Sequence, residues 1–350
     1  MTIRRRQFLK IAGAAVAMPA ISRYALGQTP EVTLKLHHFL PPVSNIHTKL
    51  LVPWAKKVEA DAGGKLKIDI FPSMQLGGTP PQLYDQARDG VADITWTLPG
   101  STPGRFPKTE VFELPFIANA KGVPNAKAMQ EFYETNMRDD FKEVHPLCVW
   151  CHDAGIVHAN KQITSMEDMK GLKLRSPTRL AGDALKALGA NGVPMPIPQV
   201  PEALAQKVLD GCVVPWEVVP SIRVHELVKF HTDIGSSPTL YTASFIISMN
   251  KAKYDSLPAD LKKAIDQNSG QSLATAAGKI WDEQGVAVRE MVQKRGNSIT
   301  TLTKDEAARW AKTTQPVVDS WLKQAKEKGL NGEKLIADAK ALLAKYANAT

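Results

Sequence analysis

The feature that most constrains the fold is an alternation of extended and helical segments that occurs twice along the chain. In the first block, the strands are "VTLKLHHF", "KLKIDIF" and "VADITWTL". A helix from about residue 45 to 62 separates the first two strands, and "TPPQLYDQARDG", with the proline start and glycine stop of a helix, precedes the third. Strands that alternate with helices of about 10 to 18 residues are typical of parallel sheets with helices on their faces. The sequence therefore predicts an α/β fold.

A proline- and glycine-rich passage at 98–116 and a helix near 125–138 lead to a second block, from about 153 to 240. This block holds the strand "GLKLRSP", the helix "RLAGDALKALG", the turn "NGVPMPIP", the helix "VPEALAQKVLDG" and the strand "CVVPWEV". The strand "YTASFIISMN" follows, and the remainder is almost wholly helical, with a capping box at Thr303–Glu306 and a helix end at Gly329.

At 350 residues the chain is long enough for two domains. We therefore expect two lobes, each a mainly parallel sheet flanked by helices, with a cleft between them. Ligands of open α/β sheets gather beyond the carboxyl ends of the strands. Four residues are predicted at such ends: Phe39, Trp96, Arg175 and Trp216.

The formal net charge of +9 does not indicate a nucleic-acid partner. Residues 1–27 carry five basic residues and no acid, which leaves 39 basic against 35 acidic residues in the rest of the chain. These remaining charges are scattered along helices, whereas a nucleic-acid face would cluster them.

The first 27 residues have the pattern of a removable export signal. "RRRQFLK" is followed by the apolar "IAGAAVAMPAI" and then by "YALG". The apolar run is too short to span a bilayer, so we expect an exported periplasmic protein without stable membrane insertion. The segment resembles a twin-arginine signal, with Arg4 where serine or threonine is usual, and general secretory export is the alternative. The matching residues are Arg5, Arg6, Phe8, Leu9 and Lys10.

Cys148 and Cys151 in "CVWC" have the spacing of a redox motif. A reactive pair normally opens a helix, where the helix dipole lowers the thiol pKa, but "PLCVWCHDAGIVHANK" is predicted to be extended. Side chains three residues apart on a strand face opposite ways, about 10 Å apart, which is too far for a disulfide. We expect no redox function.

The sequence contains no G-x-S-x-G, H-E-x-x-H or phosphate-binding glycine loop. His37, His38 and His47 lack the spacing of metal ligands. We therefore expect no metal, no cofactor and no enzyme. The alternative is an exported enzyme that acts on carboxylic acids with Glu217 or His152 as its base.

Arg175 ends the strand "GLKLRSP" directly before a chain reversal. Spacing alone leaves two interpretations open: a surface charge, or a guanidinium that grips a carboxylate through two parallel hydrogen bonds. Between closing lobes, such a charged hydrogen bond contributes about 1.5–3 kcal/mol.

The segment "SMEDMKGLKLRSPT" resembles the signature of the DctP-like periplasmic solute-binding subunits of tripartite ATP-independent periplasmic (TRAP) transporters. Further segments agree in order and spacing, and they extend over essentially the whole mature chain: "IFPSMQLGG", "DGVADITWT", "ELPF", "EALAQKVLDG" and "SMNKAKYDSLPADLKKAI". The resemblance implies a two-lobed binding protein that closes on an organic acid, with a long helix bridging the lobes and Arg175 clamping the carboxylate.

The resemblance also implies the lobe boundaries. Lobe I would comprise 28–152 plus 240–280, and lobe II would comprise 153–239 plus the C-terminal helices at 281–350. We expect a monomer that performs no chemistry and delivers its ligand to a small and a large membrane subunit. Two further ligand contacts are expected at the crossover between the lobes, His152 and Asp153.

Several expected pocket positions are apolar where relatives that bind hydroxyl-rich sugar acids carry polar residues: Phe39, Leu98, Ile197 and Val214. A second arginine that some relatives carry has no counterpart in "HDAGIVHANK". A hydroxyl-rich or dicarboxylate ligand would leave polar groups unpaired at about 1–3 kcal/mol each. We therefore favour an aromatic or other apolar monocarboxylate, with or without a 2-oxo or 2-hydroxy group. A small aliphatic oxo or hydroxy acid, or a C4-dicarboxylate, is the alternative.

Trp96, Trp216 and Tyr241 either wall a flat ring or belong to the core. In relatives that bind 2-oxo acids, a tryptophan–glutamate pair at a comparable position helps to hold a cation that bridges to the ligand. The resemblance allows Glu217 that role; the alternatives are an ion pair with Arg175 in the empty cleft, or a surface position.

Overall fold

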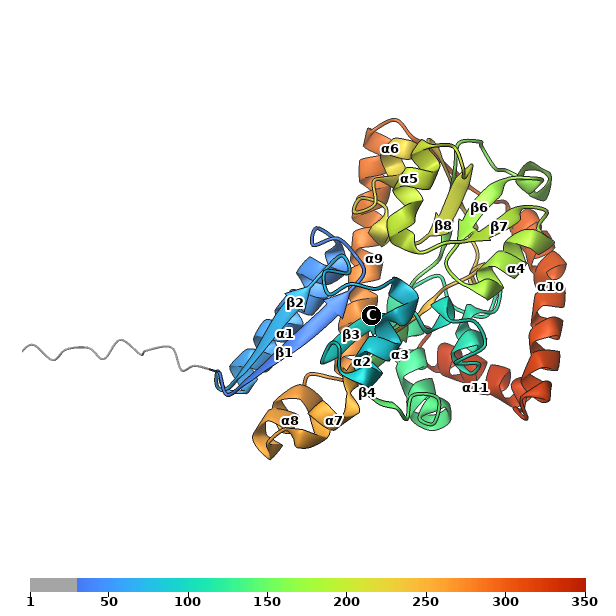
Figure 1. Cartoon of the computed structure of the whole chain (residues 1–350). Coiled ribbons are helices and arrows are strands. Elements are labelled where there is room, and N and C mark those ends of the chain that lie inside the picture. The colour runs from blue at the N-terminus through green and yellow to red at the C-terminus, as the bar shows by residue number, and fades with distance from the viewer. Residues whose placement is uncertain (1–29) are drawn as a thin grey trace, which may run out of the picture.

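A computed structural model describes residues 30–350 of the protein. The expected export signal at 1–27 lies outside the described residues. The fold consists of two β-sheets, each flanked by helices (Figure 1). We call each sheet with its helices a lobe. The predicted two-lobed α/β class is confirmed.

The first sheet has the strand order β2-β1-β3-β10-β4. Its strands are β1 (Val32–His38), β2 (Leu66–Phe71), β3 (Ile94–Thr97), β4 (Val144–Cys151) and β10 (Ser244–Asn250). The α-helices of this part of the chain are α1 (Val52–Asp61), α2 (Leu83–Asp89), α3 (Gly122–Phe132), α7 (Lys251–Ser256) and α8 (Ala259–Asp266). In β1, Leu34 and Leu36 are buried while Lys35 between them is exposed, as the alternating sequence predicts.

The second sheet has the strand order β11-β9-β5-β8-β6-β7. Its strands are β5 (Ile156–Ala159), β6 (Lys173–Ser176), β7 (Asn191–Pro194), β8 (Gly211–Val214), β9 (Phe230–Asp233) and β11 (Ser298–Thr301). The helices that accompany it are α4 (Arg179–Ala187), α5 (Val200–Ala205) and α6 (Val224–Leu227).

The chain passes between the sheets at 152–155, at 234–243 and along the long helix α9 (Gln271–Lys294) (Figure 1). The strands that follow the two loop crossings, β5 and β10, run antiparallel to both of their neighbours. This direction follows because each crossing delivers the chain to the edge where the parallel strands end. All other strand pairs are parallel.

The segment "NGVPMPIP" corrects one expectation, because its first four residues form β7 rather than a turn. Strand β7 pairs with β6 in parallel. A Cβ at Gly192 would lie only 2.8 Å from Gly182 Cα on α4. The lack of a side chain at Gly192 therefore allows α4 and β7 to approach each other closely. Strand β11 likewise interrupts the C-terminal region that was expected to be almost wholly helical.

Helix α9 packs against α3 at a pair of glycines. A Cβ at Gly278 would lie 2.7 Å from the carbonyl oxygen of Gly122. The carboxylate of Asp282 accepts the backbone N–H groups of Gly122 and Val123 at 2.7 and 3.0 Å, and so caps the first turn of α3. The bridging helix is thereby fixed to the first lobe.

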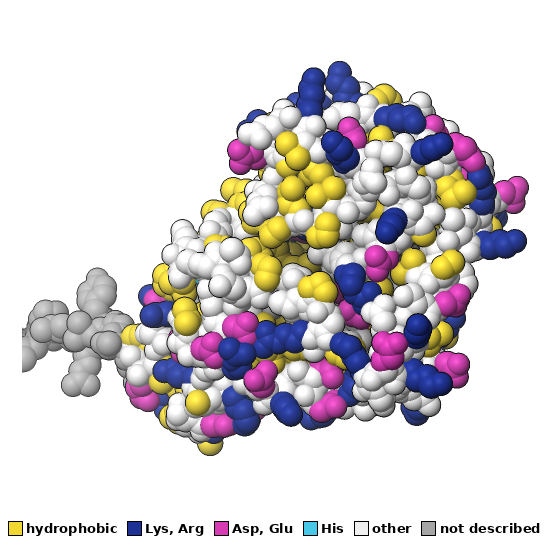
Figure 2. Space-filling view, turned by 45° about the vertical axis from the view of Figure 1, so that its right-hand side comes forward, with side chains coloured by type: hydrophobic (Ala, Val, Ile, Leu, Met, Phe, Trp, Pro, Cys, Tyr) yellow, Lys and Arg dark blue, Asp and Glu magenta, His cyan; other side chains and the backbone are white. Residues whose placement is uncertain are grey.

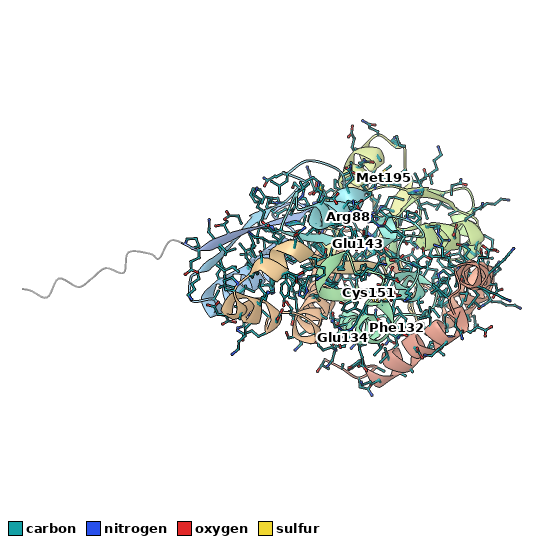
Figure 3. All side chains as sticks on the ribbon, turned by 60° about the horizontal axis from the view of Figure 1, so that its bottom comes forward. Arg88, Phe132, Glu134, Glu143, Cys151 and Met195 are labelled. Carbon is teal, nitrogen blue, oxygen red and sulfur yellow. The ribbon has the colours of Figure 1, made fainter. Side chains whose placement is uncertain are left out.

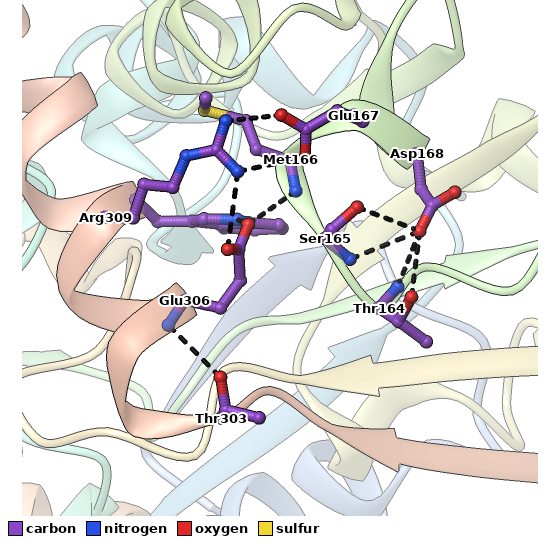
Figure 4. A network of polar contacts seen from close by, with 9 residues as sticks. Thr164, Ser165, Met166, Glu167, Asp168, Thr303, Glu306 and Arg309 are labelled. Atoms are coloured by element: carbon purple, nitrogen blue, oxygen red, sulfur yellow. Dashed lines mark hydrogen bonds and ion pairs between the residues drawn. The ribbon is translucent and has the colours of Figure 1, made fainter.

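Helices α10 (Lys304–Glu327) and α11 (Gly332–Lys345) complete the chain, α10 against α4 and α11 against α3. Thr303 accepts the Glu306 N–H at 3.2 Å, which is one half of the expected capping box. The Glu306 carboxylate does not return to Thr303. It accepts from Met166 N at 2.5 Å and Trp310 Nε1 at 2.9 Å (Figure 4), which ties α10 to the start of "SMEDMK".

The buried hydrophobic residues form three clusters, one of which contains residues of both lobes, such as Leu34 of β1 and Leu204 of α5. Cys151 and Phe132 lie inside the first lobe and Met195 lies on the second (Figure 3). Among residues 30–350 no helix is both long enough and apolar enough to cross a membrane.

Candidate functional site

A cavity of about 490 Å³ lies between the two sheets. It is lined from the first sheet by the carboxyl ends of β1 and β3 and the amino end of β10, and from the second by the carboxyl ends of β6, β7 and β8. Hydrophobic side chains surround this hollow on the molecular surface (Figure 2). The cavity therefore lies at the strand ends where the sequence places a ligand site.

Arg175 on β6 lines the cavity with only 3% of its surface exposed. Its Nε donates to Met195 O at 2.8 Å and its Nη1 donates to Val213 O at 3.4 Å. No carboxylate of residues 30–350 forms an ion pair with the guanidinium, so the expected alternative of a Glu217–Arg175 pair is not found. Burial lowers the pKa of Arg175 from its ordinary value, but arginine stays charged at neutral pH. A buried cation without a counter-ion is destabilising, and an anion placed beside it would compensate the charge.

Aromatic rings form the apolar wall of the cavity. Phe39 stacks on Trp96 with ring centroids 4.7 Å apart. Phe245 lies 5.5 Å from Trp96 and 5.4 Å from Trp281, and all four residues line the cavity. Phe245 and Trp281 were not expected at the site, because a phenylalanine inside the apolar β10 and a tryptophan on the buried face of α9 have the pattern of core residues.

Four residues of the lining carry a buried polar atom without a hydrogen-bond partner among residues 30–350. These atoms are Trp96 Nε1, Trp281 Nε1, Tyr241 OH and Glu217 Oε1. Burial raises the pKa of Glu217 to about 7 and that of Tyr241 well above its ordinary value. Unpaired buried polar groups cost about 1–3 kcal/mol each, so a ligand with hydrogen-bonding groups would relieve this cost.

All but two of the expected ligand residues line the cavity: Arg175, Phe39, Trp96, Tyr241, Glu217, His152 and Val214. The apolar Leu98 and Ile197 line it as well.

Trp216 and Asp153 lie outside the lining. Trp216 packs edge-on against His158 at 5.1 Å, with the guanidinium of Arg289 5.5 Å from its ring centroid. Burial raises the pKa of Asp153 well above its ordinary value. The structure therefore places both residues behind the wall, while Glu217 next to Trp216 reaches the cavity.

Further cations of the lining are Arg179 and Lys186 on α4. Arg179 is paired, with Glu110 at 2.9 Å and with Asp183 at 3.4 Å, and Lys186 is exposed. Among the described lining residues, Arg175 is thus the buried cation without an acidic partner.

The N-terminal histidines make hydrogen bonds to neighbouring segments of the first lobe. Leu40 N donates to His38 Nδ1 at 3.2 Å, so the proton of His38 is on Nε2, which donates to His47 Nδ1 at 2.9 Å. Leu76 N donates to His37 Nε2 at 3.3 Å, so His37 Nδ1 donates to Gln86 at 2.6 Å. Within residues 30–350, no three His, Cys, Asp or Glu side chains are grouped to hold a metal.

The cysteines are unpaired thiols in the core. Cys148 and Cys151 belong to different core clusters, which agrees with their expected positions on opposite faces of β4. Burial raises the pKa of both thiols well above the ordinary value, so they lack the acidic thiol of a redox pair.

Two sheets that direct their strand ends at one cavity, with an unpaired guanidinium in an aromatic wall, define a protein that binds an anionic small molecule between two lobes. Comparisons with known proteins agree. Residues 36–324 match the family model described as bacterial extracellular solute-binding protein, family 7 (DctP).

Solved relatives cover almost the whole chain. A TRAP solute-binding protein of Rhodoferax ferrireducens T118, in complex with copurified benzoate, is 42% identical with a TM-score of 0.87, over 90% of this chain and 98% of that one. A marine metagenome TRAP solute-binding protein specific for aromatic acid ligands, in complex with metahydroxyphenylacetate, is 44% identical with a TM-score of 0.88, over 90% and 99%. The C4-dicarboxylate-binding periplasmic protein DctP of Rhodobacter capsulatus is 24% identical over 91% of this chain and 94% of its own length.

The chain belongs to the DctP family. It is a TRAP solute-binding protein for organic acids, in a family of extracytoplasmic proteins that work with membrane subunits, and it is not an enzyme.

Proposed function

We propose that this protein captures an aromatic or similarly apolar monocarboxylate, with Arg175 as the clamp for the carboxylate. The observation that carries the proposal is the buried, unpaired guanidinium of Arg175 in a cavity walled by Phe39, Trp96, Phe245 and Trp281. Its Nε and Nη1 are already bonded to carbonyl oxygens, so the remaining N–H groups are left for one carboxylate.

The composition of the wall supports one carboxylate rather than two. The further cation Arg179 already pairs with Glu110 and Asp183. A second carboxylate would therefore lie against aromatic rings and indole N–H groups without a free buried cation. The benzoate and metahydroxyphenylacetate bound by the two solved relatives are monocarboxylates of the proposed kind.

Calorimetric titration of the purified protein with benzoate, mandelate, benzoylformate, pyruvate and succinate tests the ligand class. We expect the three aromatic acids to bind at least tenfold more tightly than pyruvate or succinate. Tightest binding of succinate would refute the apolar-wall argument and favour the C4-dicarboxylate alternative, and tightest binding of pyruvate would favour a small oxo acid. Mass spectrometry of acids that co-purify with the protein identifies the physiological member of the class.

Further expectations belong to the same proposal. Twin-arginine export directed by residues 1–27 is tested by exchanging Arg5 and Arg6 for lysine and measuring the mature protein in the periplasm.

The lobe division at 152/153, 239/240 and 280/281 is tested by limited proteolysis with and without benzoate. This division assigns α11 to lobe II, although α11 packs on α3 of the first lobe. A cation at Glu217 is tested by titrating benzoylformate with and without sodium.

A further inference from the structure

A second cavity of about 330 Å³ adjoins the first. The two cavities have five lining residues in common, and we call these residues the partition: Phe39, Leu40, Pro80, Pro196 and Ile197. Phe39, Leu40 and Pro80 come from the first lobe, whereas Pro196 and Ile197 come from the second. The partition therefore lies where the two lobes face each other.

The second cavity is chemically unlike the first. Arg175 and Glu217 line only the first cavity, and no residue of the second is charged. Beyond the partition, its apolar members are Pro41, Met74, Pro198, Pro201 and Ile222. A carboxylate held at Arg175 thus leaves the second cavity to the neutral, apolar end of a molecule, because a charge there would lose its hydration without gaining a partner.

The loop that walls the second cavity is held in place by strand β1 and by Leu40 shortly after it. Ser73 N donates to Leu40 O and Met74 N donates to His38 O, both at 3.0 Å. Leu76 N donates to His37 Nε2. These bonds maintain Ser73 and Met74 at φ of 54° and 58°, a region that is unfavourable for side chains other than glycine. Two consecutive residues in this conformation persist only where the surroundings fix them. The segment "IFPSMQLGG" does not contribute to the carboxylate clamp. It forms an ordered wall of the second cavity.

We propose that the second cavity binds the distal end of the ligand, so that the protein takes extended monocarboxylic acids. In this arrangement the carboxylate lies at Arg175, and the neutral, apolar remainder of a long acid extends through the first cavity, so that its distal end, such as a terminal phenyl ring, passes the partition into the second. The inference rests on the proposed function and names the ligand class within it. Compact acids such as benzoate occupy the first cavity alone.

The test is a chain-length series titrated into the full-length protein by calorimetry: phenylacetate, 3-phenylpropionate, 4-phenylbutyrate and 5-phenylpentanoate. Each added methylene moves the ring further past the partition and is expected to tighten binding about two- to fourfold, so that the longest acid, with three more methylenes, binds at least about eightfold more tightly than phenylacetate. An affinity that stays flat or falls along the series overturns the inference.

Gln199→Trp places bulk at a residue that lines only the second cavity and makes no side-chain hydrogen bond within residues 30–350. It is expected to remove the gain for 5-phenylpentanoate and to leave the affinity for phenylacetate within twofold. Gln206→Trp is the matched control, because Gln206 is an exposed glutamine that follows α5 and lies outside both linings. It is expected to change neither affinity.

Ser221→Phe, which enters the second cavity from a different loop, provides an independent block if Gln199→Trp melts early. Equal losses for short and long acids in both blocking variants, or no loss in either, overturn the inference. Tight phenylacetate binding without any gain from chain length overturns this inference and leaves the proposed function standing. Failure of every acid in the series to bind overturns both.

Discussion

Replacement of Arg175 by alanine tests the clamp most directly. The guanidinium is buried without an acidic partner, and a hydrogen bond between charged groups contributes about 1.5–3 kcal/mol. We therefore expect the affinity for benzoate to fall about 10- to 150-fold. Benzoate binding is measured by the quenching of tryptophan fluorescence, because Trp96 and Trp281 line the cavity. Arg175→Lys keeps the charge but loses the planar fork, and is expected to lie between alanine and the wild type.

The stability of the ligand-free protein shows whether Arg175 serves to bind the ligand or to stabilise the fold. Arg175→Ala removes hydrogen bonds to Met195 O and Val213 O, but it also removes a buried charge without a counter-ion. Because these effects oppose each other, the melting temperature without ligand should change little. Arg179→Ala is the matched control: Arg179 lines the same cavity with its charge already paired, and the loss of affinity should stay below about threefold. An unchanged benzoate affinity in Arg175→Ala would refute the clamp.

Three further predictions concern stability and thiol chemistry. Burial raises the pKa of Glu113 to about 8, so the folded protein keeps a proton that the unfolded chain loses near its ordinary pKa of 4.5, and stability falls as the pH rises through this window. Glu113→Gln should therefore raise the melting temperature above about pH 8 and change it little below about pH 5, as thermal melts at several pH values would show. Gly278→Ala on α9 would bring a Cβ to 2.7 Å from the backbone of α3 and should cost about 1–3 kcal/mol in urea unfolding. Gly285→Ala on the same helix meets its nearest neighbour at 3.4 Å and should instead gain up to about 1 kcal/mol from helix propensity. A thiol reagent should find no reactive cysteine in the native protein and three in urea, and a mild oxidant should not change that count, since Cys148 and Cys151 are buried on opposite faces of β4.

Sequence periodicity predicted the elements whose burial follows a simple pattern. β1 alternates exposed and buried residues from Thr33 to Leu36, and α4 buries Leu180, Ala184 and Leu185 at helical spacing behind an N-cap at Thr178. Strand β7 was missed because its glycine and its proline, with two further prolines shortly after it, have the composition of a turn. The decisive fact about Gly192 is its distance to α4, which no local pattern contains.

The residues of the candidate site were likewise predicted where a local sequence pattern places them, and missed where only the tertiary structure does. Residues at strand ends, such as Phe39, Trp96 and Arg175, were found because the carboxyl ends of parallel strands meet at one edge. Trp281 was missed because it enters the cavity from a helix that bridges the lobes, and a tryptophan on the apolar face of a helix has the pattern of a core residue. Trp216, for which both a wall and a core position were expected, lies outside the lining, while its neighbours Pro215 and Glu217 line the cavity.

The crossings between the lobes are also part of the ligand wall. His152 comes from the first crossing and Tyr241 from the second, and both line the cavity. The crossings pack on each other, because Gly155 N donates to Tyr241 O at 3.2 Å and a Cβ at Gly155 would lie 1.9 Å from the Tyr241 ring. The absence of a side chain at Gly155 therefore sets the position of the Tyr241 ring. The two crossings therefore form one packed unit between the sheets, and this unit positions the Tyr241 ring in the cavity lining.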